Sequence, residues 1–225
     1  AKSLIKLVEE PYIVFSGDDD FQVPNTLTQC AQFLDKNPEY ATAHGRALTF
    51  QIFESGAYGH LKSGGGYFQG EIDKDTAAAR LSQYLEHYFV LIFSVHRTAD
   101  TVYNWSMMDR LNEHTFSAEL FPFCLSSIQG KSKMLPSLSL VRQLHDARHK
   151  LPDMFDWITS PNWAPAYQMF REQLAEELVK KDHITPEAAQ EAVKRAFWAY
   201  LKKPMVEKFQ QRYGSPSVAV GIKIA

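Results

Sequence analysis

Residues 12–20 read Tyr-Ile-Val-Phe-Ser-Gly-Asp-Asp-Asp, and this stretch decides the predicted fold. The four apolar residues at 12–15 lie between Pro11 and Gly17. Such a continuous apolar run predicts a strand that is buried on both faces of an α/β sheet. Three aspartates follow at its carboxyl end. Because open α/β sheets bind ligands at the carboxyl ends of their strands, the segment also predicts a binding site.

The segments around this stretch predict helices on either side of it. A short amphipathic helix is expected over residues 4–10, and Pro11 ends it. Pro24 opens a second helix, which ends at residues 37–38, and the next strand covers residues 41–50. One face of the second helix is apolar and carries Leu27, Cys30, Ala31 and Leu34.

The middle of the chain predicts a mixture of helices and strands. Residues 51–70 are glycine-rich and predict a loop or hairpin, with Gly64-Gly65-Gly66 at a flexible tip. The remaining expectations are a helix that begins at residues 75–76 and continues to 89, a strand or helix at 91–95, a helix at 116–128 that stops at Gly130, and a strand at 138–144.

The last part of the chain is helical in character. An apolar stripe follows Pro152, and Thr185-Pro186 marks a further helix start with Thr185 as the cap. We therefore divide the chain into an α/β unit at residues 1–150 and a helical C-terminal extension at residues 151–225.

Composition restricts the classes of function. The chain has 225 residues, is 45% hydrophobic and has a formal net charge of -2, so it lacks the basic excess of a nucleic-acid binder. Cys30 and Cys124 lie far apart without metal-ligand spacing, which indicates buried free thiols and fits a cytoplasmic protein. No apolar run approaches the roughly 20 residues of a transmembrane segment.

Asp18, Asp19 and Asp20 require a chemical explanation, because adjacent like charges repel each other. A hard divalent cation, Mn²⁺ or Mg²⁺, would neutralise them and hold a diphosphate, since such cations prefer carboxylate oxygens. The alternative is a solvated acidic turn in which Asp20 helps to start the following helix.

Residues 11–21, followed by Pro24, resemble the DxD segment of family-2-like glycosyltransferases with the GT-A fold. The resemblance implies a mixed, mostly parallel sheet flanked by helices, and makes residues 1–150 a partial GT-A domain. It assigns Asp18 and Asp20 to the two D positions, which contact the ribose and the metal, with Asp19 between them or sharing the role. The chain starts one helix before the DxD strand, so the N-terminal nucleotide-binding strands are expected to be missing.

Further site residues follow from the resemblance. Glu119 lies where inverting enzymes of this kind place the catalytic base, and Asp109 and Glu113 are its nearest competitors. His145 is the candidate for a further metal ligand. Arg142 is a candidate phosphate ligand, because a guanidinium matches phosphate oxygens bidentately. An ordinary surface segment remains the alternative for both.

The resulting hypothesis is a metal-dependent, inverting transferase that moves a sugar from a nucleotide-sugar donor to a hydroxyl of a sugar or glycan acceptor. Three other classes stay open: a non-catalytic sugar-nucleotide or glycan-binding module, a nucleotidyltransferase, and a phosphatase of the haloacid dehalogenase type. Four tryptophans are candidates for core positions or for an acceptor-sugar platform: Trp105, Trp157, Trp163 and Trp198.

Overall fold

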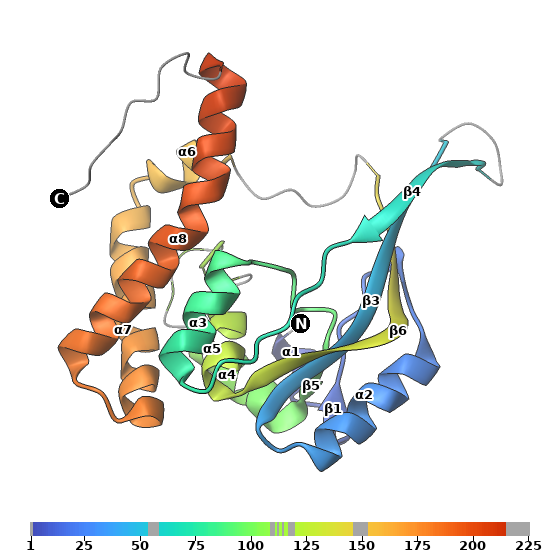
Figure 1. The fold of residues 1–225 in the computed structure, drawn as a ribbon, viewed down its shortest axis with the longest axis horizontal. Helices are drawn as coiled ribbons and strands as arrows, with labels where there is room; N and C mark the ends of the chain where they lie inside the picture. Colours follow the sequence, from blue (N-terminus) through green and yellow to red (C-terminus); the bar gives the residue numbers. More distant parts are fainter. Residues whose placement is uncertain are drawn as a thin grey trace.

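The computed structural model describes residues 2–53, 59–108, 111, 113, 115–116, 120–145 and 153–214. Figure 1 shows a curled sheet with helices on both sides and a group of long helices beyond it. The elements in chain order are α1 (Lys2–Ile5), β1 (Tyr12–Ile13), β2 (Asp20–Gln22), α2 (Pro24–Lys36), β3 (Tyr40–Ile52), β4 (Leu61–Tyr67), α3 (Ala77–Glu86), β5 (Val95–Arg97), α4 (Thr98–Met107), α5 (Phe121–Gln129), β6 (Lys131–Gln143), α6 (Met154–Ile158), α7 (Trp163–Asp182) and α8 (Pro186–Tyr213).

The α/β class and the mixed sheet are confirmed, but the expectation of a mostly parallel sheet was wrong. The strand order is β1-β5-β3-β6-β2, with β4 also paired to β3. Among the described strands, only β3 and β6 run parallel, and the other four pairings are antiparallel. The reason is that β4 pairs antiparallel beside β3, β5 lies antiparallel between β3 and β1, and β2 lies antiparallel at the edge beside β6.

Strand β1 was expected to be buried on both faces, and this was also wrong. Only Tyr12 and Ile13 pair, with Arg97 and His96 of β5, and both are half-buried. Among the described strands β1 has β5 as its single neighbour and ends the strand order. A strand with one neighbour and two paired residues cannot bury both faces. The expectation of missing N-terminal strands stays a prediction.

The longest contact in the sheet joins β3 and β6, which are 13 residues each. Their parallel pairing extends from Tyr40 opposite Lys131 to Phe50 opposite Gln143. Gly45 lies at the tightest approach, where an added Cβ would come 2.2 Å from the carbonyl oxygen of Ser137. A side chain at position 45 would therefore force the two strands apart.

The local helix signals were mostly correct. Helix α2 begins at Pro24, and Cys30 and Leu34 of the expected stripe are fully buried. Thr76 and Thr185 cap α3 and α8 through hydrogen bonds to Ala79 N and Ala188 N. Four differences concern the middle of the chain. Gly64-Gly65-Gly66 lie inside β4 rather than at a hairpin tip, and no pattern predicted α4. The element expected at 91–95 is a strand only from Val95, and the strand expected at 138–144 already begins at Lys131.

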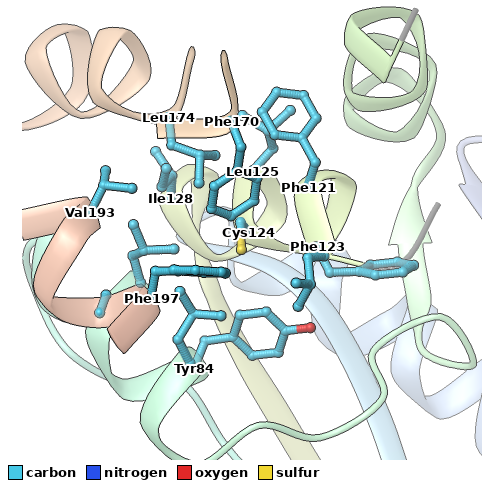
Figure 2. Close-up of a cluster of buried hydrophobic side chains, with 14 of the residues drawn as sticks. Tyr84, Phe121, Phe123, Cys124, Leu125, Ile128, Phe170, Leu174, Val193 and Phe197 are labelled. Atoms are coloured by element: carbon cyan, nitrogen blue, oxygen red, sulfur yellow. The ribbon is translucent and has the colours of Figure 1, made fainter. Parts of the chain in front are cut away.

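Helix α5 is the centre of the main core, shown in Figure 2. All residues of α5 except its last, Gln129, are buried, because α3, α4, α7 and the sheet surround it. Phe170 of α7 and Phe197 of α8 pack against the same cluster. A second, smaller cluster lies between α2 and the sheet. Both cysteines are buried and free, as expected.

The residues described after 152 are helical, as the sequence indicates, and α7 and α8 share their core with α3 and α5. Asp182, the last residue of α7, accepts hydrogen bonds from the backbone N–H groups of Ala77 and Ala78 at 2.8 Å each. These are unpaired donors of the first turn of α3, so one carboxylate joins the two groups of helices. In the described part of the chain, no helix has the length and apolarity to cross a bilayer.

We expect Asp182→Ala to lower the free energy of unfolding by about 1–2 kcal/mol, because two helix N-terminal donors lose their acceptor. Chemical denaturation measures the change. Asp75→Ala is the matched control: its exposed carboxylate pairs with Lys131 at 2.9 Å, and such surface pairs contribute little. An equal decrease in the free energy of unfolding of the two variants would show that the hydrogen bonds of Asp182 contribute no more than a surface ion pair.

Two buried histidines predict how stability depends on pH. His44 and His96 are both 3% exposed, and burial lowers the pKa of each to about 4. In the unfolded chain the same rings titrate near 6.5. Between pH 6.5 and 4 the unfolded state therefore binds protons that the folded state does not bind. The free energy of unfolding decreases as the pH is lowered across that window. The contribution is full above about pH 6.5.

The free energy of unfolding should fall by at most roughly 3 kcal/mol per histidine between pH 6.5 and 4. Urea denaturation across this range tests the expectation. In His44→Gln, the slope of stability against pH should shrink, whatever the variant does to stability at neutral pH. An unchanged slope would contradict the assignment to His44.

Candidate functional site

Chain direction brings the acidic turn and the end of β6 to one edge of the sheet. Strand β1 is antiparallel to β5, and β5 is antiparallel to β3. Strands β1, β3 and β6 therefore point the same way, and the segments that follow β1 and β6 lie at the shared carboxyl edge. After β1 the chain turns at residues 18–19 and enters β2, which pairs with the end of β6.

Asp20 lies opposite Arg142 in the pairing of β2 with β6. Its side chain is 3% exposed, and its Oδ1 is 3.7 Å from Arg142 Nε. The backbone N–H of Gln143 donates to the carboxylate, but Oδ1 is buried without a hydrogen-bond partner. Burial raises the pKa of Asp20, because the cost of desolvation outweighs the attraction of the guanidinium. Asp20 therefore presents a buried oxygen with unused acceptor capacity.

Asp19 contacts His145 directly. His145 Nε2 lies 2.5 Å from Asp19 Oδ2, and both side chains are one-third exposed. The hydrogen bond to His145 is the main cause that lowers the pKa of Asp19. Asp19 and Asp20 are thus chemically different although they are adjacent: one is a partly exposed partner of a histidine, and the other is a buried carboxylate beside an arginine.

Arg142 is held by two aromatic residues that the sequence did not indicate. Its Nη1 donates to the Tyr67 hydroxyl at 2.9 Å, and its guanidinium carbon lies 4.8 Å from the centre of the Phe93 ring. Tyr67 ends β4, and Phe93 lies just before β5. Neither has a local signature, because each matters only through its distance to Arg142. The guanidinium is 27% exposed and directed at Asp20, so it meets a carboxylate where the sequence suggested a phosphate.

Gly17 lets the acidic turn fold back on itself. An added Cβ would lie 2.9 Å from Asp19 Oδ1 and 2.9 Å from Asp20 Oδ2, which is closer than real side chains come. The two carboxylates therefore pack against bare backbone. Asp18 is exposed and takes no part in the contacts with Arg142 and His145.

A cleft of about 420 Å³ opens beside His145. Its walls come from the end of β3, the start of β4 and the end of β6, and Lys62 is the cationic group in it. The full lining is Gln51, Ile52, Phe53, Lys62, Gln143, Leu144 and His145. A cleft of this volume is within the range of small-ligand sites.

The predicted base falls outside the described residues. Glu119 and its competitor Asp109 are both among the residues that the structure does not describe. Glu113, the other competitor, accepts a hydrogen bond from the backbone N–H of Phe116 at 2.8 Å. Its carboxylate therefore already has a structural role at a helix start.

The side chains of the site supply some, but not all, of the oxygen ligands that a hard divalent cation needs. Within the described ranges, no three His, Cys, Asp or Glu side chains are grouped around one metal position. Mg²⁺, however, commonly uses one or two carboxylates and takes its other ligands from substrate phosphates and water. The unpaired Asp20 Oδ1 fits that requirement.

Neither a protein-family model nor a curated protein matches this sequence. Function is therefore inferred from the side chains of the site and from the resemblance of residues 11–24.

The contact between Asp19 and His145 predicts a selective change in titration. In His145→Gln the pKa of Asp19 should rise, because the variant loses the hydrogen bond and the charge that favour the carboxylate. The pKa of Asp20 should stay raised, since burial is its main cause. Carboxyl ¹³C NMR titration measures both groups. A parallel shift of Asp19 and Asp20 would contradict separate environments.

Proposed function

We propose that the protein is a metal-dependent glycosyltransferase that uses a nucleotide-sugar donor. The observation that supports this most is the pair of contacts Asp19–His145 and Asp20–Arg142. They join two segments that lie far apart in the sequence, and they do so at the carboxyl edge of an α/β sheet, where ligands of this fold class bind.

In this proposal Asp20 holds Mn²⁺ or Mg²⁺, with Asp18 and His145, which are not grouped around one metal position with it in the structure, as the further candidate ligands. Asp18 and Asp19 also contact the donor. When bound, the cation would neutralise the diphosphate leaving group. The raised pKa of Asp20 supports its part, because a buried carboxylate gains when a cation offsets its charge. Tyr67 and Phe93 hold the Arg142 guanidinium beside Asp20. Its permanent positive charge would bind a phosphate oxygen of the donor there.

The acceptor is a sugar or glycan hydroxyl, which needs a base to remove its proton as it attacks the donor. We assign this role to Glu119 from the resemblance, and such a base contributes typically about 10²–10⁴-fold to the rate. Attack on the face opposite the leaving group makes the transfer inverting.

A sugar-nucleotide-binding module without turnover is the second candidate. Its support is that Asp19 contacts His145 and Asp20 lies beside Arg142, so both carboxylates already have partners within the protein. Turnover distinguishes the two candidates.

Calorimetric titration with nucleoside diphosphates, with and without Mn²⁺ or Mg²⁺, tests the proposal. We expect binding that requires the cation and that falls about tenfold or more in Asp20→Asn, because the buried ligand oxygen loses its charge. Asp75→Asn removes an exposed carboxylate elsewhere and should bind normally. Glu119→Gln should retain binding but lose release of nucleoside diphosphate from the sugar nucleotide.

Three results would contradict these assignments. Binding that is equally tight without a cation would exclude the metal site, and unchanged binding in Asp20→Asn would place it elsewhere. Normal turnover in Glu119→Gln would remove that residue as the base. Tight cation-dependent binding with no turnover on any donor would favour the module.

A further inference from the structure

The outer face of α8 carries large apolar side chains that are exposed. We define this face by Arg195, Trp198, Lys202, Val206, Phe209 and Tyr213, which follow one another at intervals of three or four residues and so share one side of the helix. Trp198 is 48% exposed, Val206 49%, Phe209 47% and Tyr213 67%. The opposite side of α8 packs into the core through Val193, Phe197 and Leu201. Helix α8 therefore carries apolar side chains on both sides, because aromatic groups also lie on the side that faces solvent.

The same part of α8 is strongly basic. Residues 194–214 hold six basic side chains and one acidic side chain, a net charge of +5 in a chain whose total is -2. The acidic residue, Glu207, lines a cleft with Glu86 and Tyr88 of the α3 region and so faces away from the outer face. Two of the six basic side chains, Arg195 and Lys202, lie among the exposed aromatic side chains of the outer face, whereas Lys203 lines the same cleft as Glu207.

Carboxylates at the start of α6 and Glu191 of α8 itself offset part of this charge. Asp153 pairs with Lys208 at 3.1 Å, and Asp156 lines a small cleft with Arg212. On the outer face Arg195 has only a 4.0 Å contact with Glu191, in which both side chains are more than half exposed. Arg195 and Lys202 therefore keep most of their charge available to a partner.

The end of α8 is also accessible. Every residue from 206 to 214 is exposed, and Figure 1 shows this part of the helix rising beyond the neighbouring helices. In that view it points to the same side of the molecule as the carboxyl ends of β3 and β6. A flat partner could therefore reach this helix end.

We propose that the outer face of α8 binds the surface of an anionic lipid bilayer. Trp, Tyr and Phe enter the boundary between headgroups and acyl chains, where an aromatic ring can be buried while its polar edge stays hydrated. Arg and Lys interleaved with them reach the anionic headgroups through their flexible stems. Charge complementarity selects this partner over a neutral surface. The inference is independent of the proposed transferase activity.

Co-sedimentation with vesicles tests the proposal without measuring transfer. The protein should pellet with vesicles of phosphatidylcholine and phosphatidylglycerol, but little with phosphatidylcholine alone, and added salt should weaken the binding. The double variant Arg195→Glu/Lys202→Glu should lower the partition coefficient roughly tenfold or more. Phe209→Ser/Tyr213→Ser should also release the protein, because the apolar part of the contact is lost.

Matched controls keep the test specific. Lys36→Glu/Lys181→Glu makes the same change of charge at exposed positions on α2 and α7, and should alter binding by less than about twofold. All substituted side chains are exposed, so circular dichroism should show unchanged folding.

Three results would overturn the proposal: no pelleting above the phosphatidylcholine level, equal losses in the control, or a salt-independent interaction. A dimer in light scattering that Phe209→Ser/Tyr213→Ser dissociates would also overturn it, because the face would then serve a second copy.

Discussion

The parallel pairing of β3 with β6 is the contact on which the rest of the structure depends. It is the longest pairing in the sheet, and every other strand except β1 joins it directly. Because the two strands run the same way, the end of β6 arrives at the edge where the acidic turn lies. A chain that entered β6 in the opposite direction would place Arg142 and His145 at the far edge, and the candidate site would not form.

Folding brings the carboxylates of Asp19 and Asp20 close together, which costs free energy, and the two carboxylates are stabilised to different degrees. Asp19 is stabilised as a carboxylate by His145, whereas burial destabilises the charge of Asp20. Arg142 compensates only in part, at 3.7 Å and while held by two aromatic residues. Folding alone would be better served by apolar residues at these positions. Perturbed titration of neighbouring carboxylates is typical of functional sites.

The C-terminal helices complete the core of the α/β unit. Helix α5 is buried along nearly its whole length because α4 and α7 cover the sides that the sheet and α3 leave open. The Asp182 carboxylate ties α7 to the start of α3, and Arg80 of α3 in turn donates to the carbonyl groups of Ser127 and Ile128 near the end of α5. Burial of α5 and the capping of its neighbours therefore stabilise one another.

The sequence by itself determined the elements whose signals are local. Pro24, Thr76 and Thr185 start helices through contacts within one turn, and the pattern of apolar residues places β3 and the last six residues of β6. Only the tertiary structure decided which strands pair and in which direction, how little of β1 is buried, and that Tyr67 and Phe93 surround Arg142. The contact between Asp19 and His145 spans 126 positions in the chain. Such contacts depend on the summed pairing and packing energy of many residues, which no short segment of sequence contains.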